Sequence, residues 1–233
     1  MQSPQLQEDD ILYEDNHLLI INKKGGWPVQ GDASGDESVV EMSKAFLKKK
    51  YGKPGNVFAG LVHRIDRPVS GLVLIAKTGK ALSRMTKSFQ SREVEKYYLA
   101  VTLHKMPMER GFLENELLKD HGKNRVRVLS APRAGSKTAR LDYEVLAESG
   151  GHYLLGIRPL TGRSHQIRVQ LAHAGAVIAG DLKYGASAPL PDKSIALHAR
   201  SLAFMHPVKK EPLKITAPLP PISIWSKFEN QIN

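Results

Sequence analysis

The sequence predicts an α+β fold in which a central, mixed and mostly antiparallel sheet carries flanking helices. Two observations lead to this class: many short apolar segments of strand length run along the 233 residues, and only three segments have helical periodicity. The strand and helix segments do not alternate strictly, which favours an α+β domain. Because no internal repeat and no long Pro/Gly-rich linker divides the chain, one domain is expected.

The elements follow from apolar patterning and turn residues. Residues 1–10 are expected to be a flexible lead-in, and residues 11–233 the folded domain. Helices are predicted at 38–51, 80–92 and 164–174. Strands are predicted at 11–14, 18–22, 72–77, 96–102, 124–130, 139–147, 152–158 and 196–204.

The helix at 38–51 has the clearest local signals. Ser38 and Glu41 have the spacing of a capping box, and three lysines near its end suit the negative end of the helix dipole. In the third helix, Ile167 and Leu171 lie four residues apart and are expected to face the core.

The charge distribution is the first indication of function. The chain has 34 basic and 23 acidic side chains, a formal net charge of +11. Residues 1–60 carry seven basic and nine acidic groups, residues 61–145 seventeen and nine, and residues 146–233 ten and five. A basic surface on a folded domain indicates a polyanionic partner, most often a nucleic acid, and ordinary solubility charge is the alternative.

Several classes of protein are excluded by what the sequence lacks. Cysteine is absent, which rules out disulfides, thiolate zinc sites and cysteine nucleophiles and fits a reducing compartment. The acidic, polar N-terminus does not predict a signal or transit peptide, and no apolar run approaches the ~20 residues of a membrane span. No metal-binding histidine pair, P-loop or G-x-G-x-x-G occurs. We expect a cytoplasmic protein without membrane, metal or cofactor.

The first candidate site is the segment 61–71, which leads into an apolar strand. Asp66 lies between Arg64 and Arg67, and Pro68 disfavours helical geometry at Arg67. A carboxylate flanked by guanidinium groups should remain ionised at neutral pH, which suits a nucleophile or an electrostatic stabiliser better than a general acid. The alternative is a surface Arg–Asp pair that holds a loop.

The second candidate site is the segment 160–168, which opens the third helix. Arg163 falls just before the helix, and Arg168 lies on its first turns. No acidic side chain lies within residues 149–180, so these arginines must find an anion elsewhere. Phosphate and Asp66 are the candidates, and a helix terminus with solvated arginines is the alternative.

A third feature is the basic segment 119–140, which has seven basic residues and one acidic residue, Asp120. The alternation from Arg125 to Leu129 predicts a cationic hairpin with one apolar face. The hairpin is either an arm that grips RNA or a solvated edge protected by charge.

Together these segments resemble the RluA/RluD-type family of RNA pseudouridine synthases, from about Ile11 to Pro218. The opening ILYEDNHLLIINKKGG is similar to the family's first strand pair and K-P-x-G turn. His63–Leu72 resembles H-R-L-D-x-x-T-S-G-L, Lys96–Ala100 resembles K-x-Y-x-A, and Thr161–Ala172 resembles T-G-R-x-H-Q-I-R-x-x-L-A. The remaining motifs, in family order, are Gly180-Asp181, Tyr184-Gly185 and Leu197-His198-Ala199.

The chain departs from the family pattern at three positions. Ile65 replaces a leucine, Val69 a threonine, and Lys24 the proline after Lys23. None of these changes removes a group assigned to catalysis. We expect the chain to start directly at the catalytic domain, without the small RNA-binding module of many relatives. On that expectation the catalytic domain itself recognises the RNA, and tRNA stays open as a substrate.

The resemblance implies one catalytic domain with an active-site cleft, which isomerises specific uridines in structured RNA (23S rRNA, tRNA or both) to pseudouridine without cofactor or metal. It implies that Asp66 is the nucleophile, that Tyr98 stacks on the uracil and serves in removing the C5 proton, and that Arg168 meets Asp66 and keeps it ionised. Arg64 would fill the stack that the flipped base leaves. The residues expected to bind RNA are Arg64, Arg67, Arg163, His165, Lys123, Arg125, Arg127 and Lys137.

Two rival functions follow from the same residues. A catalytically silent RNA-binding protein on this fold would be expected to have lost the nucleophile, yet Asp66, Tyr98 and Arg168 are all present. A hydrolase that uses Asp66 with an activated water would release free uracil. We expect a monomer whose partner is a stem-loop of rRNA or tRNA.

Overall fold

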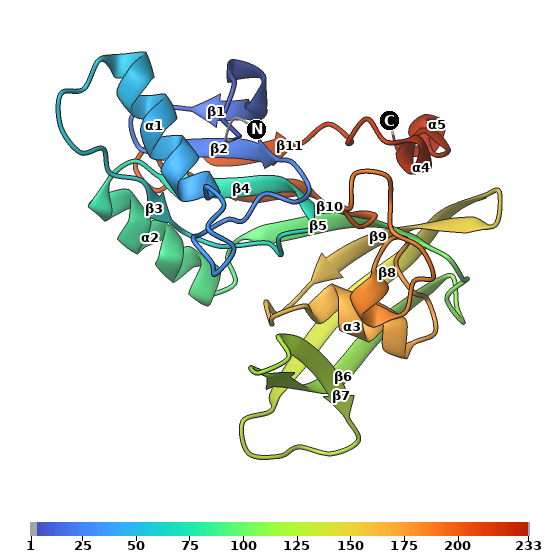
Figure 1. Ribbon diagram of the computed structural model, residues 1–233. Helices are drawn as coiled ribbons and strands as arrows, with labels where there is room; N and C mark the ends of the chain where they lie inside the picture. The colour runs from blue at the N-terminus through green and yellow to red at the C-terminus, as the bar shows by residue number, and fades with distance from the viewer. Residues whose placement is uncertain (1–3, 233) are drawn as a thin grey trace. The chain divides into compact units, whose positions relative to one another are not determined.

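The computed structural model describes residues 4–232, which form two compact units. The first unit contains the described residues up to Glu95 together with Ala199–Pro218. The second contains Lys96–His198 and the described residues from Leu219 onward. Figure 1 labels the elements of both. One domain is predicted from residue 11 to 233, and the described chain consists of these two units.

The first unit is built on antiparallel strand pairs. β1 (Ile11–Glu14) pairs with β2 (Leu18–Lys23), and β2 pairs with β4 (Ser70–Ala76), which also pairs with the short β3 (Gly60–Leu61). All seven residues of β4 are buried, as are five of the six in β2. These two strands are therefore the core of the unit and carry the loops that leave their ends.

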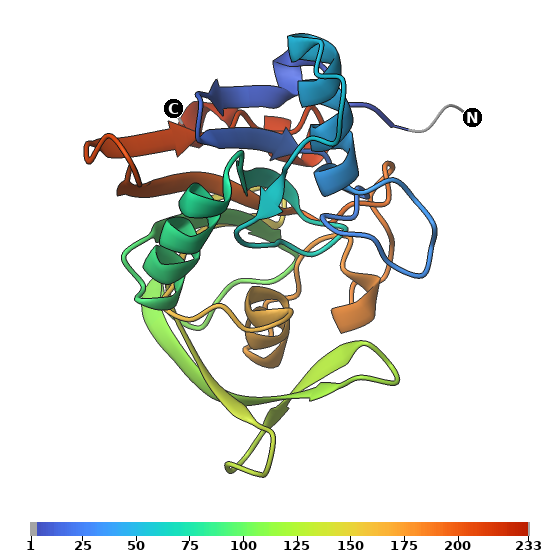
Figure 2. The ribbon, with the colours of Figure 1, turned by 90° about the vertical axis from the view of Figure 1, so that its left-hand side faces the viewer.

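A hairpin and two helices complete the first unit. β10 (Leu197–Met205) follows β4 in the strand order and pairs antiparallel with β11 (Pro212–Thr216). α1 (Val39–Tyr51) and α2 (Gly79–Gln90) lie alongside the strands (Figure 2). The hydroxyl of Ser38 accepts a hydrogen bond from the backbone of Glu41, so the predicted cap of α1 is confirmed.

The second unit is a five-stranded antiparallel sheet in the order β5-β9-β8-β6-β7. Its strands are β5 (Glu95–Thr102), β6 (Arg110–Asp120), β7 (Arg125–Leu129), β8 (Lys137–Ser149) and β9 (His152–Pro159). Asp120 is paired with Arg125 across the β6–β7 turn, so the predicted hairpin in the basic segment is confirmed.

Helix α3 (Gln166–His173) packs on β6 and β7 of this unit. Ile167 and Leu171 are buried as predicted. The 3-10 turn η2 (Leu182–Tyr184) follows, and the short helices α4 (Ser223–Ser226) and α5 (Glu229–Ile232) end the described chain. None of the helices in the described part of the chain is long and apolar enough to cross a membrane.

The structure confirms the α+β class, the mostly antiparallel pairing and the flanking helices, and it adds β3, β6 and β11 to the predicted strands. Residues 4–10 differ from the flexible lead-in that we expect. Leu6 is buried, and the 3-10 turn η1 (Glu8–Asp10) is closed by the Asp10 carboxylate, which accepts a hydrogen bond from the backbone N–H of Gln7. An apolar anchor and a capped turn therefore order this stretch. Residues 1–3 of the lead-in lie outside the described residues.

Candidate active site

Asp66 lies on a tight turn immediately before β4 in the first unit. Its carbonyl accepts a hydrogen bond from the backbone N–H of Val69 at 3.0 Å. Ile65 and Val69 are buried on either side of the turn, whereas Asp66 is only partly buried. The apolar neighbours therefore anchor the backbone and leave Asp66 at the border of the core, where it is only partly buried.

The backbone conformation of Gly71 and its close contact with β10 explain why a glycine stands at this position of the motif. Its φ of +106° lies in the left-handed region, and an added Cβ would be 2.3 Å from the carbonyl oxygen of Ala199. Only glycine allows β10 to approach the start of β4 so closely. The glycine of the predicted motif thus has a structural role, in holding the strand that follows Asp66.

A buried lysine, Lys23, is hydrogen-bonded to the backbone of the same turn. Lys23 is 0% exposed, and its Nζ donates hydrogen bonds to the carbonyls of Lys24, Trp27 and Arg67, each at 2.9 Å. Burial lowers the pKa of Lys23 to about 7, against the opposing effect of the negative charge of Asp66. Because Arg67 follows Asp66 in the chain, this ammonium both holds the turn and places a positive charge near the carboxylate.

Sequence reasoning assigned no role to Lys23. The available signal was a lysine that continues the apolar run of β2 at a position that faces the core. A charged residue at such a position needs several polar partners. Those partners are carbonyls of two separate loops, which the sequence does not identify.

Two further predicted residues lie beside Asp66. The guanidinium of Arg67 donates to the carbonyl of Gly26 at 2.9 Å and to the hydroxyl of Ser34 at 2.8 Å, and it also forms an ion pair with Asp36. It therefore braces the loop between β2 and α1. Arg64 is exposed, with a hydrogen bond to the side chain of Gln30 at 3.3 Å.

Tyr98 and Arg168 lie in the second unit. Tyr98 is partly buried on β5, where it is paired with Ile157 of β9. Arg168 is on α3, and its guanidinium binds the carboxylate of Asp181 through two hydrogen bonds of 2.7 and 2.8 Å. The side chains of Arg168 and Asp181 are 5% and 2% exposed, so this is a buried bidentate ion pair. Sequence reasoning placed Asp181 in a motif without recognising it as the partner of Arg168.

The turn before α3 is held by the motif's own polar residues. The side-chain oxygen of Gln166 accepts hydrogen bonds from the hydroxyl of Thr161 and the backbone of Arg163, at 2.7 and 3.0 Å. Its amide nitrogen donates to the carbonyl of Arg140 on β8 at 2.9 Å. Arg163 also donates to the carbonyl of Thr138 at 3.0 Å. Thr161 and Gln166 therefore fasten the start of α3 to β8 and fix the position of Arg168.

His165 is the residue before α3 and is buried, with a left-handed φ of +50°. Its Nδ1 is hydrogen-bonded to the hydroxyl of Tyr184 at 2.8 Å. His165 is predicted to bind RNA, and in the structure its Nδ1 contributes to the packing of the fold through this hydrogen bond.

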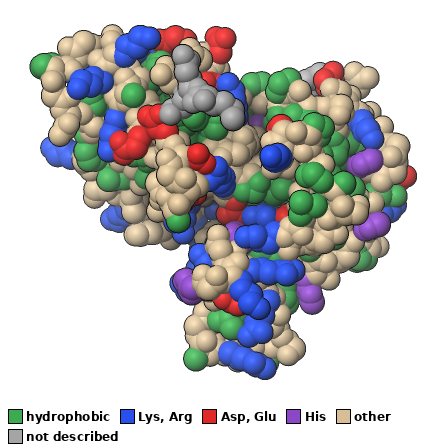
Figure 3. Space-filling view, viewed as in Figure 1, with side chains coloured by type: hydrophobic (Ala, Val, Ile, Leu, Met, Phe, Trp, Pro, Cys, Tyr) green, Lys and Arg blue, Asp and Glu red, His purple; other side chains and the backbone are tan. Residues whose placement is uncertain are grey.

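The remaining predicted RNA-binding residues lie on the β6–β7 hairpin and at the start of β8. They are all exposed: Lys123, Arg125, Arg127 and Lys137. Lys and Arg side chains gather over this hairpin at the bottom of Figure 3. Arg125 also lies over the ring of Tyr184, with 5.6 Å from Cζ to the ring centroid. The hairpin therefore presents a cationic surface of the kind that contacts phosphates.

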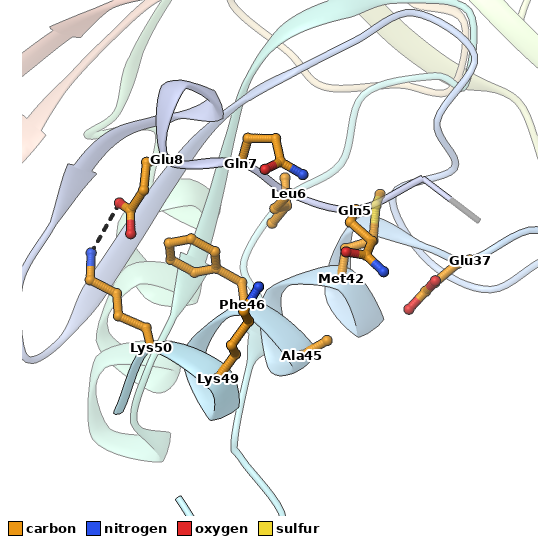
Figure 4. A pocket seen from close by; sticks show the side chains of 10 residues that line it. All are labelled: Gln5, Leu6, Gln7, Glu8, Glu37, Met42, Ala45, Phe46, Lys49 and Lys50. Carbon is orange, nitrogen blue, oxygen red and sulfur yellow. Dashed lines mark hydrogen bonds and ion pairs between the residues drawn. The ribbon is translucent and has the colours of Figure 1, made fainter. Parts of the chain in front are cut away.

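A separate groove lies between η1 and α1 in the first unit (Figure 4). Leu6, Met42 and Phe46 line it, and an ion pair of 3.2 Å between Glu8 and Lys50 crosses one end. It contains no predicted site residue. Within residues 4–232, no group of three or more histidines and carboxylates is arranged to hold a metal ion.

Comparisons with known proteins bear on this site. A family model described as RNA pseudouridylate synthase matches residues 17–173. Ribosomal large subunit pseudouridine synthase C of Buchnera aphidicola is 35% identical over 91% of this chain and 67% of its own length. Ribosomal large subunit pseudouridine synthase D of Xylella fastidiosa is 34% identical over 91% of this chain and 66% of its own. The chain thus spans about two thirds of the length of these relatives.

Solved structures agree with the sequence comparisons. The human RNA Pseudouridylate Synthase Domain Containing 4 protein superposes with a TM-score of 0.75 and 25% identity, over 91% of this chain and 88% of that chain. The matched segment 17–173 includes Asp66, Tyr98 and Arg168, and both bacterial relatives exceed 30% identity over most of the chain. The protein therefore belongs to the RNA pseudouridylate synthase family.

Proposed function

We propose that the protein is a pseudouridine synthase that isomerises specific uridines in ribosomal RNA. The observation that carries the proposal is the partly buried Asp66, on a braced turn above a buried cation, in a chain of this family. The bacterial relatives are named for the large ribosomal subunit, which supports rRNA as the substrate. Transfer RNA is the second substrate to be tested, because the basic hairpin grips phosphates without reading sequence.

The proposed reaction rearranges one nucleotide. The bond between N1 of uracil and C1′ of ribose breaks, a bond between C5 and C1′ forms, and the proton of C5 is released while N1 gains one. No electrons are gained or lost. Asp66 is proposed as the nucleophile toward the nucleoside, Tyr98 as the residue that stacks on the uracil and takes part in removing the C5 proton, and Arg168 as the cation that favours ionised Asp66.

The target uridine is proposed to leave its helix before it reacts. A base inside an RNA stem is inaccessible, and flipping it costs a few kcal/mol. Arg64 is exposed next to Asp66 in the sequence, and its planar guanidinium can occupy the stack that the base vacates. The hairpin residues supply contacts with the phosphates that position the stem.

The decisive experiment maps pseudouridine in a strain that lacks the gene. Carbodiimide mapping of rRNA and tRNA is compared among the deletion, its complement with the wild-type gene, and a complement with Asp66→Ala. We expect one or more rRNA sites to vanish in the deletion and to return only with the wild-type gene. Asp9→Ala, which alters an exposed acidic side chain in the same unit, should restore the sites fully.

The outcomes separate the rival functions. Restoration by Asp66→Ala would overturn the proposed nucleophile, and an unchanged map of both RNA pools would overturn the proposed substrates. Purified protein incubated with RNA distinguishes the reactions, because an isomerase leaves the RNA mass unchanged whereas a hydrolase releases uracil. Binding without either product would leave the silent RNA-binding protein.

The role of the hairpin is tested by reversing its charge. A variant with Lys123, Arg127 and Lys137 changed to glutamate should bind RNA more weakly, and the dependence of log Kd on log salt should become shallower by roughly 0.7–0.9 for each phosphate that the variant no longer neutralises. A matched variant with Lys48, Lys49 and Lys53 changed to glutamate reverses three exposed lysines at the end of α1 and just after it, and it should bind like the wild type. Unchanged binding by the hairpin variant would contradict this role.

A further inference from the structure

The short segment Asp181–Tyr184, here called the strap, connects α3 to the β6–β7 hairpin. At one end, Asp181 holds the guanidinium of Arg168 through the bidentate pair. At the other end, Lys183 donates to the carbonyl of Asn124 in the hairpin turn at 2.9 Å. Two parts of the proposed function, the candidate catalytic helix and the candidate RNA-binding hairpin, are therefore fastened to the same few residues.

The hydroxyl of Tyr184 is the central contact of the strap. It accepts a hydrogen bond from the backbone N–H of Val126 on β7 at 2.9 Å and is hydrogen-bonded to Nδ1 of His165 at 2.8 Å. Which of the two groups donates depends on the tautomer of His165, but in either case the hydroxyl joins β7 to the residue before α3.

The aromatic ring of Tyr184 also links α3 to the hairpin, because it contacts one arginine from each of them. The Cζ atoms of Arg168 and Arg125 lie 5.1 and 5.6 Å from the ring centroid, which is within the range of cation–π contacts. Tyr184 is 7% exposed and belongs to a buried cluster with Val126 of the hairpin and Val169 of α3. A displacement of β7 therefore changes the environment of the tyrosine that contacts Arg168.

The strap is held together by its own backbone hydrogen bonds, so it can transmit such a displacement. The carbonyl of Asp181 accepts hydrogen bonds from the backbones of Tyr184 and Ala186, each at 3.0 Å. Gly185 follows with a φ of +115°, which closes the turn. The left-handed φ of His165 is unfavourable for a residue with a side chain, and the bond to Tyr184 helps to hold it.

We propose that Tyr184 is a positioning residue that couples the grip of the β6–β7 hairpin on RNA to the placement of Arg168. The inference rests on the proposed function, because it assigns the hairpin to RNA and Arg168 to the reaction. RNA that binds the hairpin favours one position of β7. Because Tyr184 contacts both β7 and Arg168, this position of β7 determines where Arg168 lies at the start of α3.

The test combines Tyr184→Phe with Arg127→Gln, since Arg127 is exposed on the hairpin and its neighbour Val126 contacts the strap. The assay measures release of tritium from C5 of uridine in a large-subunit rRNA transcript, under single-turnover conditions at saturating enzyme. We expect Tyr184→Phe to lower the rate constant about tenfold and to change the Kd for RNA less than about twofold.

The double variant separates coupling from a merely structural effect. Arg127→Gln should lower the saturated rate in the wild-type background, and this loss should shrink or vanish when Tyr184 is already phenylalanine. Tyr143→Phe, which removes the hydroxyl of another buried tyrosine of the second unit, should leave both the rate and the effect of Arg127→Gln unchanged. Additive effects of Tyr184→Phe and Arg127→Gln, or a wild-type rate for Tyr184→Phe, would overturn the inference.

The wild-type protein distinguishes the two levels of the proposal. If it binds the transcript but releases no tritium, the proposed function fails, whereas an active wild type with additive variants refutes only the coupling. Thermal unfolding checks that Tyr184→Phe is folded. If it is not, Lys183→Met, which removes the strap's bond to the carbonyl of Asn124, takes its place in the same cycle, and additivity there overturns the coupling.

Discussion

Each of the two units contains a buried cation, Lys23 in the first and Arg168 in the second, and the two cations are stabilised differently. Lys23 in the first unit donates its hydrogen bonds to three backbone carbonyls. Arg168 in the second unit is bound by the carboxylate of Asp181. Both side chains are nearly inaccessible to solvent, at 0% and 5% exposure. The first cation is thus held mainly by dipoles and the second by a full opposite charge.

The chemistry of the two side chains accounts for the difference. A lysine can lose its proton when burial becomes too costly, and the pKa of Lys23 is lowered to about 7 by burial. An arginine stays protonated in proteins, so a buried guanidinium needs a carboxylate in bidentate geometry. The second unit therefore holds a permanent positive charge, whereas the charge below Asp66 responds to pH.

The largest expected effect comes from removing the counterion of Arg168. Asp181→Asn removes the carboxylate that binds the buried guanidinium in bidentate geometry, which should lower the free energy of unfolding by about 3–5 kcal/mol. Urea denaturation measures the loss. The protein has two tryptophans, one in each unit, so in a Trp27→Phe background the fluorescence of Trp225 reports on the second unit.

A double variant shows whether charge or packing causes this loss. Arg168→Met combined with Asp181→Leu removes both charges and keeps apolar volume, and it should recover most of the stability. If the double variant is as unstable as Asp181→Asn, the pair contributes through its shape, and the contrast with Lys23 does not hold.

The next effect concerns the pH dependence that Lys23 confers. Its pKa is about 7 in the folded protein and near 10.5 in the unfolded chain, so the unfolded chain binds more protons between pH 7 and 10.5. Stability from this group should therefore be constant below pH 7 and increase above it, by at most about 1.4 kcal/mol per pH unit. The stability advantage of the wild type over Lys23→Met should grow through that window.

Unfolding by urea at pH values from 6 to 10, read from Trp27 in a Trp225→Phe background, measures this difference. Lys49→Met provides the control, because Lys49 is exposed on α1, and its difference from the wild type should stay flat over the window. A flat difference for Lys23→Met would show that burial does not perturb the lysine.

The smallest effect is expected from Ser38→Ala, which changes no charged group and therefore serves as a reference for the two cation variants. Ser38→Ala removes the cap of α1, which should cost about 1 kcal/mol. Because a hydroxyl does not titrate, the loss should be the same at every pH from 6 to 10. A pH-dependent loss would mean that global titration affects all variants, and the pH profile of Lys23→Met would need the same correction.

Local signals accounted for much of the fold. The capping residues of α1 and the alternating pattern at 125–129 predict elements that the structure contains. β6 escaped prediction because Phe112, Leu113 and Leu117 have spacings that suit a helix as well as a strand. This segment becomes a strand because it pairs with β7 on one side and with β8 on the other, and both partners come later in the chain.

The candidate site was also predictable only in part, because its motifs are local in sequence whereas their contacts involve distant segments. The resemblance to the family's motifs predicts Asp66, Tyr98 and Arg168 as site residues, and the family itself is confirmed. It did not reveal that Asp181 binds Arg168, nor that Gln166 and Thr161 serve mainly to hold the turn before α3. A motif shows that residues belong together without showing which of them contact each other.

By itself, the sequence determined the α+β class, the positions of most helices and strands, the cationic hairpin and the family to which the chain belongs. These features depend on neighbours a few positions apart, through side-chain periodicity, caps and turns. Only the tertiary structure decided that backbone carbonyls hold Lys23, that Asp181 neutralises Arg168 and that Tyr184 connects α3 to the hairpin. Buried polar groups must find partners wherever the chain brings them, and that choice depends on packing between distant segments.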